Sequence, residues 1–231
     1  MEYEEFVRKR RIYMSLVVFA EENDRSHDAS FVGETFGDGE LLRLLGIKND
    51  RRRNESAAGL VALKNALGDK CSALLKRDER GRPYFPSEKE MDLSISHSGS
   101  VSVAVLACGP DSRVGIDIEK VDEKKEDTHR RIANRYFSEG EQTALAASES
   151  PLEFYRIWTS KEARAKLTGK GLAELISSDK TQKKDKDENL RFMHFLLTYK
   201  SEGYVLTVCV NKNEKIKFNC SNEMTFKVLT P

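Results

Sequence analysis

The sequence lacks the features that mark membrane, secreted and zinc-binding proteins. No stretch of its 231 residues approaches the roughly 18 consecutive apolar residues that a membrane-spanning helix needs. The cysteines, Cys71, Cys108, Cys209 and Cys220, form no CxxC pair and no spacing typical of a disulfide scaffold. The four histidines are scattered and show no zinc-like spacing. We therefore expect reduced cysteines, a cytoplasmic location and no membrane partner.

A strong net charge is also missing. The formal charge is +1, so the whole molecule has no electrostatic bias toward nucleic acid, and any basic site must be local. A hydrophobic content of 39% and a charged content of 33% suit a soluble globular protein. The length allows one large domain or two small ones.

The amino terminus resembles a signal peptide only in part. A basic run at residues 8–11 precedes the apolar residues 12–20, but Glu2, Glu4 and Glu5 interrupt the positive region. No small-residue cleavage site follows the apolar residues. We interpret residues 12–20 as a first buried strand.

A short strand with two carboxylates is the centre of the sequence. Apolar residues at positions 114, 116 and 118 alternate with Asp117 and Glu119, which predicts a strand with one apolar face. The two acids then share the other face, with Cα atoms about 6.5–7 Å apart. Mg²⁺ would relieve their repulsion. The alternative is an exposed strand in which Glu119 pairs with Lys120 or a nearby arginine.

A helix near residue 160 carries a third candidate acid. Phe154, Trp158, Glu162 and Lys166 recur every fourth residue, so they line one stripe of a helix. The two aromatic residues would seat the stripe in the core, and Glu162 and Lys166 would extend from that packed base. The alternative is an ordinary surface ion pair between Glu162 and Lys166, worth about 0.2–0.5 kcal/mol.

Five ordered segments together resemble a known family. The order S-H-S-G, G-I-D-I-E, F-S-x-x-E, W-T-S-K-E-A and G-K-G-L is similar to that of the 4′-phosphopantetheinyl transferases, of the larger, surfactin-synthetase-activating type. The segments are residues 96–99, 115–119, 137–141, 158–163 and 169–172. The resemblance is close from about residue 81 to residue 172 and looser in the flanks.

The resemblance implies a fold and an activity. The fold would be α+β, with two similar α/β halves related by a pseudo-two-fold axis, each an antiparallel sheet packed against a long helix. The activity would be the Mg²⁺-dependent transfer of 4′-phosphopantetheine from coenzyme A to a serine of an apo acyl or peptidyl carrier protein. Adenosine 3′,5′-bisphosphate would be released. The carriers of fatty-acid, polyketide and nonribosomal-peptide pathways are all possible acceptors, and the chain would act as a monomer.

The resemblance also implies roles for individual residues. Asp117, Glu119 and Glu162 would bind Mg²⁺, and Glu162, Lys166 and His97 would be catalytic. Whether Glu162 or a water molecule takes the serine proton is left open. The residues implied to bind coenzyme A are Arg52, Arg53, Arg82, Ser96, His97, Lys161 and Lys166.

A run of three arginines precedes the second of two helices that we expect in the first half. We expect the first helix at residues 40–45, and the second to begin after Asn54 as its N-cap and to end near Leu67. Arginines and free N–H groups at a helix start make a phosphate site, and the resemblance assigns Arg52 and Arg53 to the 3′-phosphate of coenzyme A. The alternative is solvated charge. Many relatives carry a further arginine where this chain has Leu60.

The other expected elements divide the chain near its middle. Residues 93–96 and 101–107 predict two strands around a turn at His97, and residues 108–113 are rich in turn formers. We therefore expect a coenzyme half at residues 1–112 and a carboxylate half at residues 113–231. In the second half we expect a charged loop at residues 121–129, a capping box at Ser138, a hairpin at residues 192–210 and two edge strands near the end.

Two other functions fit parts of the sequence. A Mg²⁺-dependent hydrolase of nucleotide or coenzyme pyrophosphates could use the same carboxylates, with water as the acceptor. A noncatalytic module could use residues 51–53 to bind a carrier protein or RNA, but three converging acids would have no purpose in it.

Overall fold

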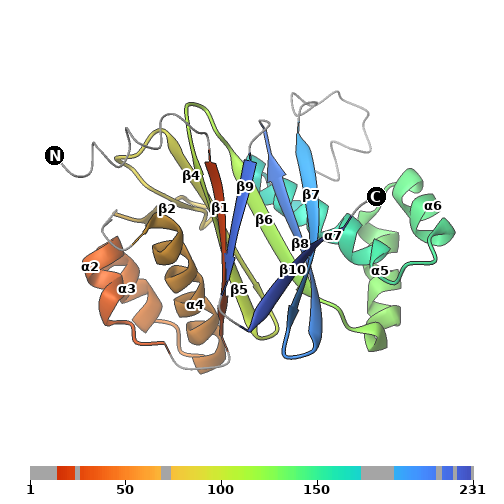
Figure 1. Cartoon of the computed structure of the whole chain (residues 1–231), viewed down its shortest axis with the longest axis horizontal. Coiled ribbons are helices and arrows are strands. Elements are labelled where there is room, and N and C mark those ends of the chain that lie inside the picture. Colours follow the sequence, from red (N-terminus) through yellow and green to blue (C-terminus); the bar gives the residue numbers. More distant parts are fainter. Residues whose placement is uncertain are drawn as a thin grey trace.

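The structure is a computed structural model, and it describes residues 15–23, 27–68, 74–172, 190–211, 215–220 and 223–229. Two four-stranded sheets lie next to each other at the centre of the molecule, with helices on both flanks (Figure 1). No described helix is long enough and apolar enough to cross a membrane. Cys108, Cys209 and Cys220 form no disulfide within the described part of the chain, and Cys71 lies outside it.

The first sheet is built mainly from the first half of the chain. Its strand order is β4-β5-β1-β9, and β1 pairs with β5 antiparallel and with β9 parallel. These strands are β1 (Ser15–Glu22), β4 (Met91–Ser98), β5 (Val101–Cys108) and β9 (Lys215–Cys220). The first of the two expected edge strands therefore returns from the end of the chain to the first sheet. Its parallel pairing departs from the purely antiparallel arrangement that was expected.

The second sheet is antiparallel throughout and has the order β10-β7-β8-β6. Its strands are β6 (Val114–Lys120), β7 (Arg191–Tyr199), β8 (Glu202–Val210) and β10 (Met224–Val228). The predicted hairpin is confirmed as β7 and β8, and residues 200 and 201 at its turn both have positive φ. Strand β10 is the second expected edge strand.

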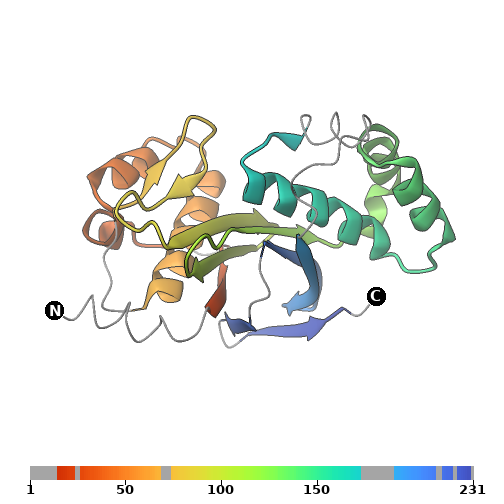
Figure 2. The same ribbon diagram turned by 90° about the horizontal axis from the view of Figure 1, so that it is seen from above.

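Helices cover the outer face of the first sheet. The long helix α4 (Asp50–Leu67) packs on β5 and β1, with α2 (Ser30–Phe36) and α3 (Asp38–Leu45) beside it. A two-stranded hairpin, β2 (Lys76–Arg77) and β3 (Pro83–Tyr84), follows α4. Figure 2 shows α4 and this hairpin on one flank and the helices of the second half on the other.

The second sheet carries its own long helix. Helix α7 (Glu153–Thr168) packs on β6 and β8, after η1 (Glu123–Lys125), α5 (Glu126–Tyr136) and α6 (Glu139–Ala147). The α+β class, with a long helix on each sheet, is confirmed. Ser138 and Glu141 form the predicted capping box at the start of α6. The boundary between residues 112 and 113 stays a prediction.

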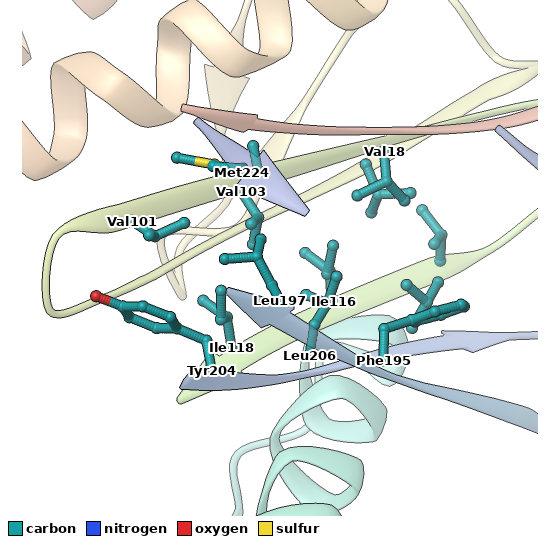
Figure 3. Packing of buried hydrophobic residues seen from close by; sticks show 14 of the residues in the cluster. Val18, Val101, Val103, Ile116, Ile118, Phe195, Leu197, Tyr204, Leu206 and Met224 are labelled. Atoms are coloured by element: carbon teal, nitrogen blue, oxygen red, sulfur yellow. The ribbon is translucent and has the colours of Figure 1, made fainter. Parts of the chain in front are cut away.

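The largest hydrophobic cluster lies between the two sheets (Figure 3). Alternation divides each inner strand between this core and a helix. In β5, Val101 and Val103 face the core between the sheets, whereas Ala104 and Leu106 pack toward α4. In β6 the apolar residues 114, 116 and 118 face the same core, so Asp117 and Glu119 lie on the side of α7.

Three local predictions were wrong. Helix α4 begins at Asp50, because Asn49 rather than Asn54 is its N-cap and accepts a hydrogen bond from the backbone N–H of Arg52. Strand β4 continues through Ser98, so His97 lies in a strand and the turn contains Gly99 at φ 55°. The expected loop at residues 121–129 contains η1 and the start of α5, because the side chain of Asp122 caps η1.

Candidate functional site

The two sheets are joined by side chains that reach from β4 to β6. Each of these strands is the edge of its own sheet, and they lie side by side without pairing through their backbones. Asp92 Oδ2 accepts a hydrogen bond from Val114 N–H at 2.9 Å, and Ser94 Oγ accepts one from Ile116 N–H at 3.2 Å. Ser98 Oγ continues the series with Lys120 N–H at 3.0 Å. Alternate polar residues of β4 therefore satisfy N–H groups on the free edge of β6.

The same series of side chains holds the first candidate acid. Asp117 is buried, with 5% of its surface exposed. Its Oδ1 accepts hydrogen bonds from Ser96 Oγ at 2.8 Å and from Lys166 Nζ at 2.7 Å, and Lys166 Nζ also donates to Ser96 Oγ. Its Oδ2 is buried and has no hydrogen-bond partner among the described residues. Because a buried carboxylate oxygen without a partner is costly, this atom is a candidate ligand for a cation.

The carboxylate of Asp117 affects the pKa values of the other two acids, Glu119 and Glu162. Burial, with the nearby Asp117 carboxylate, raises the pKa of Glu119, although hydrogen bonds from Ser98 and Trp158 oppose the rise. Burial and the Asp117 carboxylate also raise the pKa of Glu162, against the opposing effect of Lys166. The raised pKa values indicate that burial, together with the neighbouring carboxylates, disfavours the charged form of both acids more than their hydrogen bonds and Lys166 favour it.

The charge and the donor atoms of these acids suit a hard divalent cation such as Mg²⁺. Their side-chain positions do not by themselves form a metal cage. Among the residues that the structure describes, no three His, Cys, Asp or Glu side chains are grouped closely enough to hold an ion. Lys166 Nζ donates a hydrogen bond to Asp117 Oδ1, whereas Asp117 Oδ2 has no hydrogen-bond partner among the described residues.

A cavity of about 750 Å³ opens beside the acids. Arg52 and His97 line it from the first half of the chain, and Glu162 and Lys166 line it from α7. Its other charged lining residues are mostly basic: Arg43, Arg77, Arg80, Arg82 and Lys170, against Glu55 alone. The cavity suits a polyanionic ligand, because its walls carry an excess of positive charge.

His97 is the histidine that lines this cavity, and it lies beside a buried glutamate. Its Nδ1 is 3.5 Å from Glu55 Oε2, and about half of its side chain is exposed. Burial lowers the pKa of His97, the Glu55 carboxylate raises it, and Lys166 lowers it again. The net shift is downward, so the ring is mainly neutral at pH 7 and can donate only one hydrogen bond.

The arginine run does not precede a helix, as was expected, but forms the first turn of α4. Arg51 Nε donates to the buried Glu55 at 2.8 Å. Arg53 pairs with Asp50 and donates to Ile47 O at 2.9 Å. Arg52 alone of the three lines the cavity. The helix places successive side chains about 100° apart, so one turn cannot direct all three toward one ligand.

Of the other residues predicted to bind coenzyme A, some line the cavity and some do not. Arg82 lines the cavity but also pairs with Asp92, at 2.8 Å. Lys161 is 11% exposed and pairs with Glu141 of α6 at 2.9 Å, so it ties α7 to α6. Of the described residues that the sequence singled out, Arg53, Ser96, Asp117, Glu119 and Lys161 do not line the cavity.

Three arginines of the cavity, Arg43, Arg77 and Arg80, were not predicted, and two of them share one buried carboxylate. Arg43 and Arg77 both bond to the buried Glu40, Arg43 Nε at 2.9 Å and Arg77 Nη2 at 2.8 Å. Burial alone would raise the pKa of Glu40, but the hydrogen bonds from Arg77 and Arg43 outweigh it and lower the pKa. No local signal marks this group, because Arg77 comes from a different element, far along the chain from Glu40.

Comparisons with known proteins agree on one family. The sequence profile of the 4′-phosphopantetheinyl transferase superfamily matches residues 113–209. A 4′-phosphopantetheinyl transferase of Bacillus subtilis is 37% identical over 142 residues, which are 57% of this chain and 60% of that protein. The 4′-phosphopantetheinyl transferase AcpT of Salmonella typhi is 33% identical over 133 residues, 56% of this chain and 66% of that protein. These two matches span less than two thirds of the relatives' lengths.

A third relative is matched over more of its length. The 4′-phosphopantetheinyl transferase Sfp of Bacillus subtilis strain 168 is 30% identical over 175 residues, which are 72% of each chain. The superfamily profile covers β6, α7 and β8, the elements that hold the three acids and Lys166 or pack against them. The chain therefore belongs to the 4′-phosphopantetheinyl transferase superfamily.

Proposed function

We propose that this protein transfers the 4′-phosphopantetheine group from coenzyme A to a serine hydroxyl of an apo carrier protein. The observation that carries the proposal is the basic cavity between α4 and α7, where Arg52 and His97 face Glu162 and Lys166. Coenzyme A is a polyanion with a pyrophosphate and a 3′-phosphate, so its charge complements this wall. The names of the three relatives support the same reaction.

Mg²⁺ belongs to the proposal as the cofactor, with Asp117, Glu119 and Glu162 as its ligands. The support is the unpartnered Asp117 Oδ2 and the raised pKa values of Glu119 and Glu162, both of which a cation would relieve. When bound, the ion would neutralise charge that develops on the pyrophosphate oxygens.

The residues of the cavity then have separate tasks. The serine oxygen forms a bond to the β-phosphorus of coenzyme A, the bond from that phosphorus to the bridging oxygen breaks, and adenosine 3′,5′-bisphosphate leaves. Glu162, or a water molecule beside it, accepts the serine proton. Lys166 and His97 donate hydrogen bonds to phosphate oxygens and hold the pyrophosphate for in-line attack.

The proposal assigns the two sides of the cavity to two halves of one chain. Residues 1–112 bind the nucleotide side of the coenzyme, and residues 113–231 supply the acids, so a monomer suffices. A cytoplasmic location completes the proposal, because carrier proteins and coenzyme A would be available there. Gel filtration of the active protein would test the monomer, and activity confined to a dimer would refute it.

The decisive experiment is mass spectrometry of apo-carrier proteins after incubation with coenzyme A, Mg²⁺ and this protein. We expect one phosphopantetheine adduct on the acceptor serine, and none when that serine is replaced by alanine or when the metal is chelated. A fatty-acid, a polyketide and a nonribosomal-peptide carrier would be compared to identify the acceptor. Consumption of coenzyme A at the same rate without any carrier would refute transfer and favour the pyrophosphate hydrolase.

A further inference from the structure

Arginines from outside the helix bind the C-terminal end of α7. The last carbonyl groups of a helix have no donor within it, so they need partners from elsewhere. Arg82 Nε donates to Lys166 O at 2.8 Å, and Arg80 Nη1 donates to Gly169 O at 2.6 Å. Both arginines come from the β2–β3 hairpin of the first half. Their positive charge also suits the negative end of the helix dipole.

A buried carboxylate on β4 holds one of these arginines in place. Arg82 Nη2 donates to both oxygens of Asp92, at 2.9 and 2.8 Å, while its Nε reaches α7. Asp92 is 8% exposed and also accepts the hydrogen bond from Val114 N–H at the start of β6. One side chain therefore connects the hairpin, β4 and β6, and through Arg82 it connects them to α7.

Both ends of Lys166 are linked to residues on one face of β4, its backbone through Arg82 and its Nζ directly. Its backbone oxygen is bound by Arg82, which Asp92 anchors, and its Nζ is bound by Ser96 and Asp117. Asp92 and Ser96 are four residues apart in a strand, so their side chains point the same way. The position of the Lys166 ammonium group thus depends on the same strand that holds its backbone.

We propose that Asp92 and Arg82 are positioning residues, which fix the end of α7 and thereby hold Lys166 against Asp117. This inference rests on the proposed function, and it assigns Arg82 a role other than the coenzyme contact that the family resemblance implies. The two roles predict different kinetics. A positioning residue affects turnover, because Lys166 is misplaced in every complex. A contact to the coenzyme mainly affects the KM for coenzyme A.

The test compares Arg82→Met and Asp92→Asn with the control Arg130→Met. Arg130 is an exposed arginine of α5, and in the described part of the chain its ion pair is with Asp127 of the same helix. Two quantities are measured in the full-length protein: amide hydrogen exchange of residues 164–169, and kcat and KM for coenzyme A. Far-UV circular dichroism verifies folding, and Arg82→Lys replaces Arg82→Met if the latter does not fold, since a lysine keeps a charge beside Asp92.

In Arg82→Met and Asp92→Asn we expect exchange at residues 164–169 to rise about tenfold or more, because the end of the helix opens locally. We expect kcat to fall about 10- to 100-fold, with KM for coenzyme A within about twofold of its original value, since small misplacements of this kind are costly. The loss in the double variant should be smaller than the combined losses of the two single variants, because Arg82 and Asp92 share one contact, although Asp92 also binds Val114 N–H and Arg113. Arg130→Met should change neither quantity.

Two results would overturn the proposal. A raised KM with unchanged exchange and kcat would make Arg82 a coenzyme contact, and increased exchange with unchanged kcat would show that the end of α7 does not position Lys166. If the unmodified protein fails to transfer, the proposed function falls. Exchange at residues 164–169 then still decides whether Asp92 and Arg82 hold α7.

Discussion

Gly115 allows α7 to approach β6 so closely that a single methyl group should displace the helix. A Cβ atom built at Gly115 would overlap the carbonyl oxygen of Ala163 and lie 2.7 Å from the backbone nitrogen of Leu167. Both atoms belong to the backbone of α7, so neither can rotate away as a side chain could. Gly115→Ala must therefore move the helix or bend the strand.

The expected cost follows from that geometry. Carbon atoms rest about 3.5–4.0 Å from their neighbours, so α7 must shift by about 1.5 Å or more to clear the Ala163 oxygen. Overpacking usually costs 1–3 kcal/mol, and a rigid backbone contact puts this case at about 3 kcal/mol. For a chain of this size that corresponds to a fall in Tm of about 6–12 °C. Glu162 and Lys166 belong to α7 and would move with it, so we expect the transfer activity to fall about 100-fold.

Differential scanning calorimetry and the carrier-protein assay would measure both effects. The matched control is Gly140→Ala in α6, where a Cβ would meet nothing within 4 Å. That change should stabilise the protein by about 0.5–1 kcal/mol, because glycine is unfavourable inside a helix. A Tm for Gly115→Ala within about 1 °C of the unmodified protein, with full activity, would refute the close approach of helix and strand.

Three further variants test the site. Arg52→Ala should raise the KM for coenzyme A about tenfold, and the KM for 3′-dephospho-coenzyme A less, since charged hydrogen bonds contribute about 1.5–3 kcal/mol. Arg53→Ala should change both KM values little. Equal effects of the two variants in steady-state kinetics would contradict the geometry. Asp117→Asn should lower transfer at least 100-fold and abolish the rise in Tm that Mg²⁺ causes, and a persistent metal-dependent rise would exclude Asp117 as a ligand. Burial, helped by Arg156, lowers the pKa of His194 to about 4. The unfolded chain therefore protonates this histidine near pH 6.5, whereas the folded chain does so only near pH 4. The free energy of unfolding falls as the pH drops from 6.5 to 4, by about 1–2 kcal/mol after screening. His194→Gln should flatten this part of the curve of Tm against pH.

The elements that could be predicted from the sequence are those with local causes. The capping box of Ser138 and Glu141 is complete within four residues, and the stripe from Phe154 to Lys166 repeats with the helical period. The strand alternation of residues 114–119 likewise depends only on its own side chains. These features predicted α6, α7 and β6, whereas the proximity of Asp117 to Glu162 and Lys166 was implied only by the family resemblance.

The start of α4 was missed because two asparagines compete as its cap. Asn54 and Asn49 are both good N-cap residues, and nothing local decides between them. In the structure Asn49 has an extended backbone and its side chain accepts a hydrogen bond from the N–H of Arg52, so the arginines that follow it lie in the first turn of the helix. The choice matters for function, because it turns Arg53 toward Asp50 and leaves Arg52 at the cavity.

The role of the serines in β4 depends on a contact that only the fold creates. Their alternation with Leu93 and Ile95 was visible in the sequence, but it indicated a strand and a turn and did not identify a partner. The partner is the edge of β6, which comes from the other half of the chain. The contacts of Arg82 with Asp92 and α7 were hidden for the same reason.

An unpaired sheet edge and a cluster of acids are each unfavourable, and in this fold one strand compensates for both. The free N–H groups of β6 would otherwise need water or another chain, and β4 satisfies them with the side chains of Asp92, Ser94 and Ser98. The next side chain of that series, Ser96, bonds to Asp117 and Lys166. The same strand turns His97 to its opposite face, where His97 lines the basic cavity together with Glu162 and Lys166 of α7. Changes that loosen the interface should therefore impair the site before they unfold the chain.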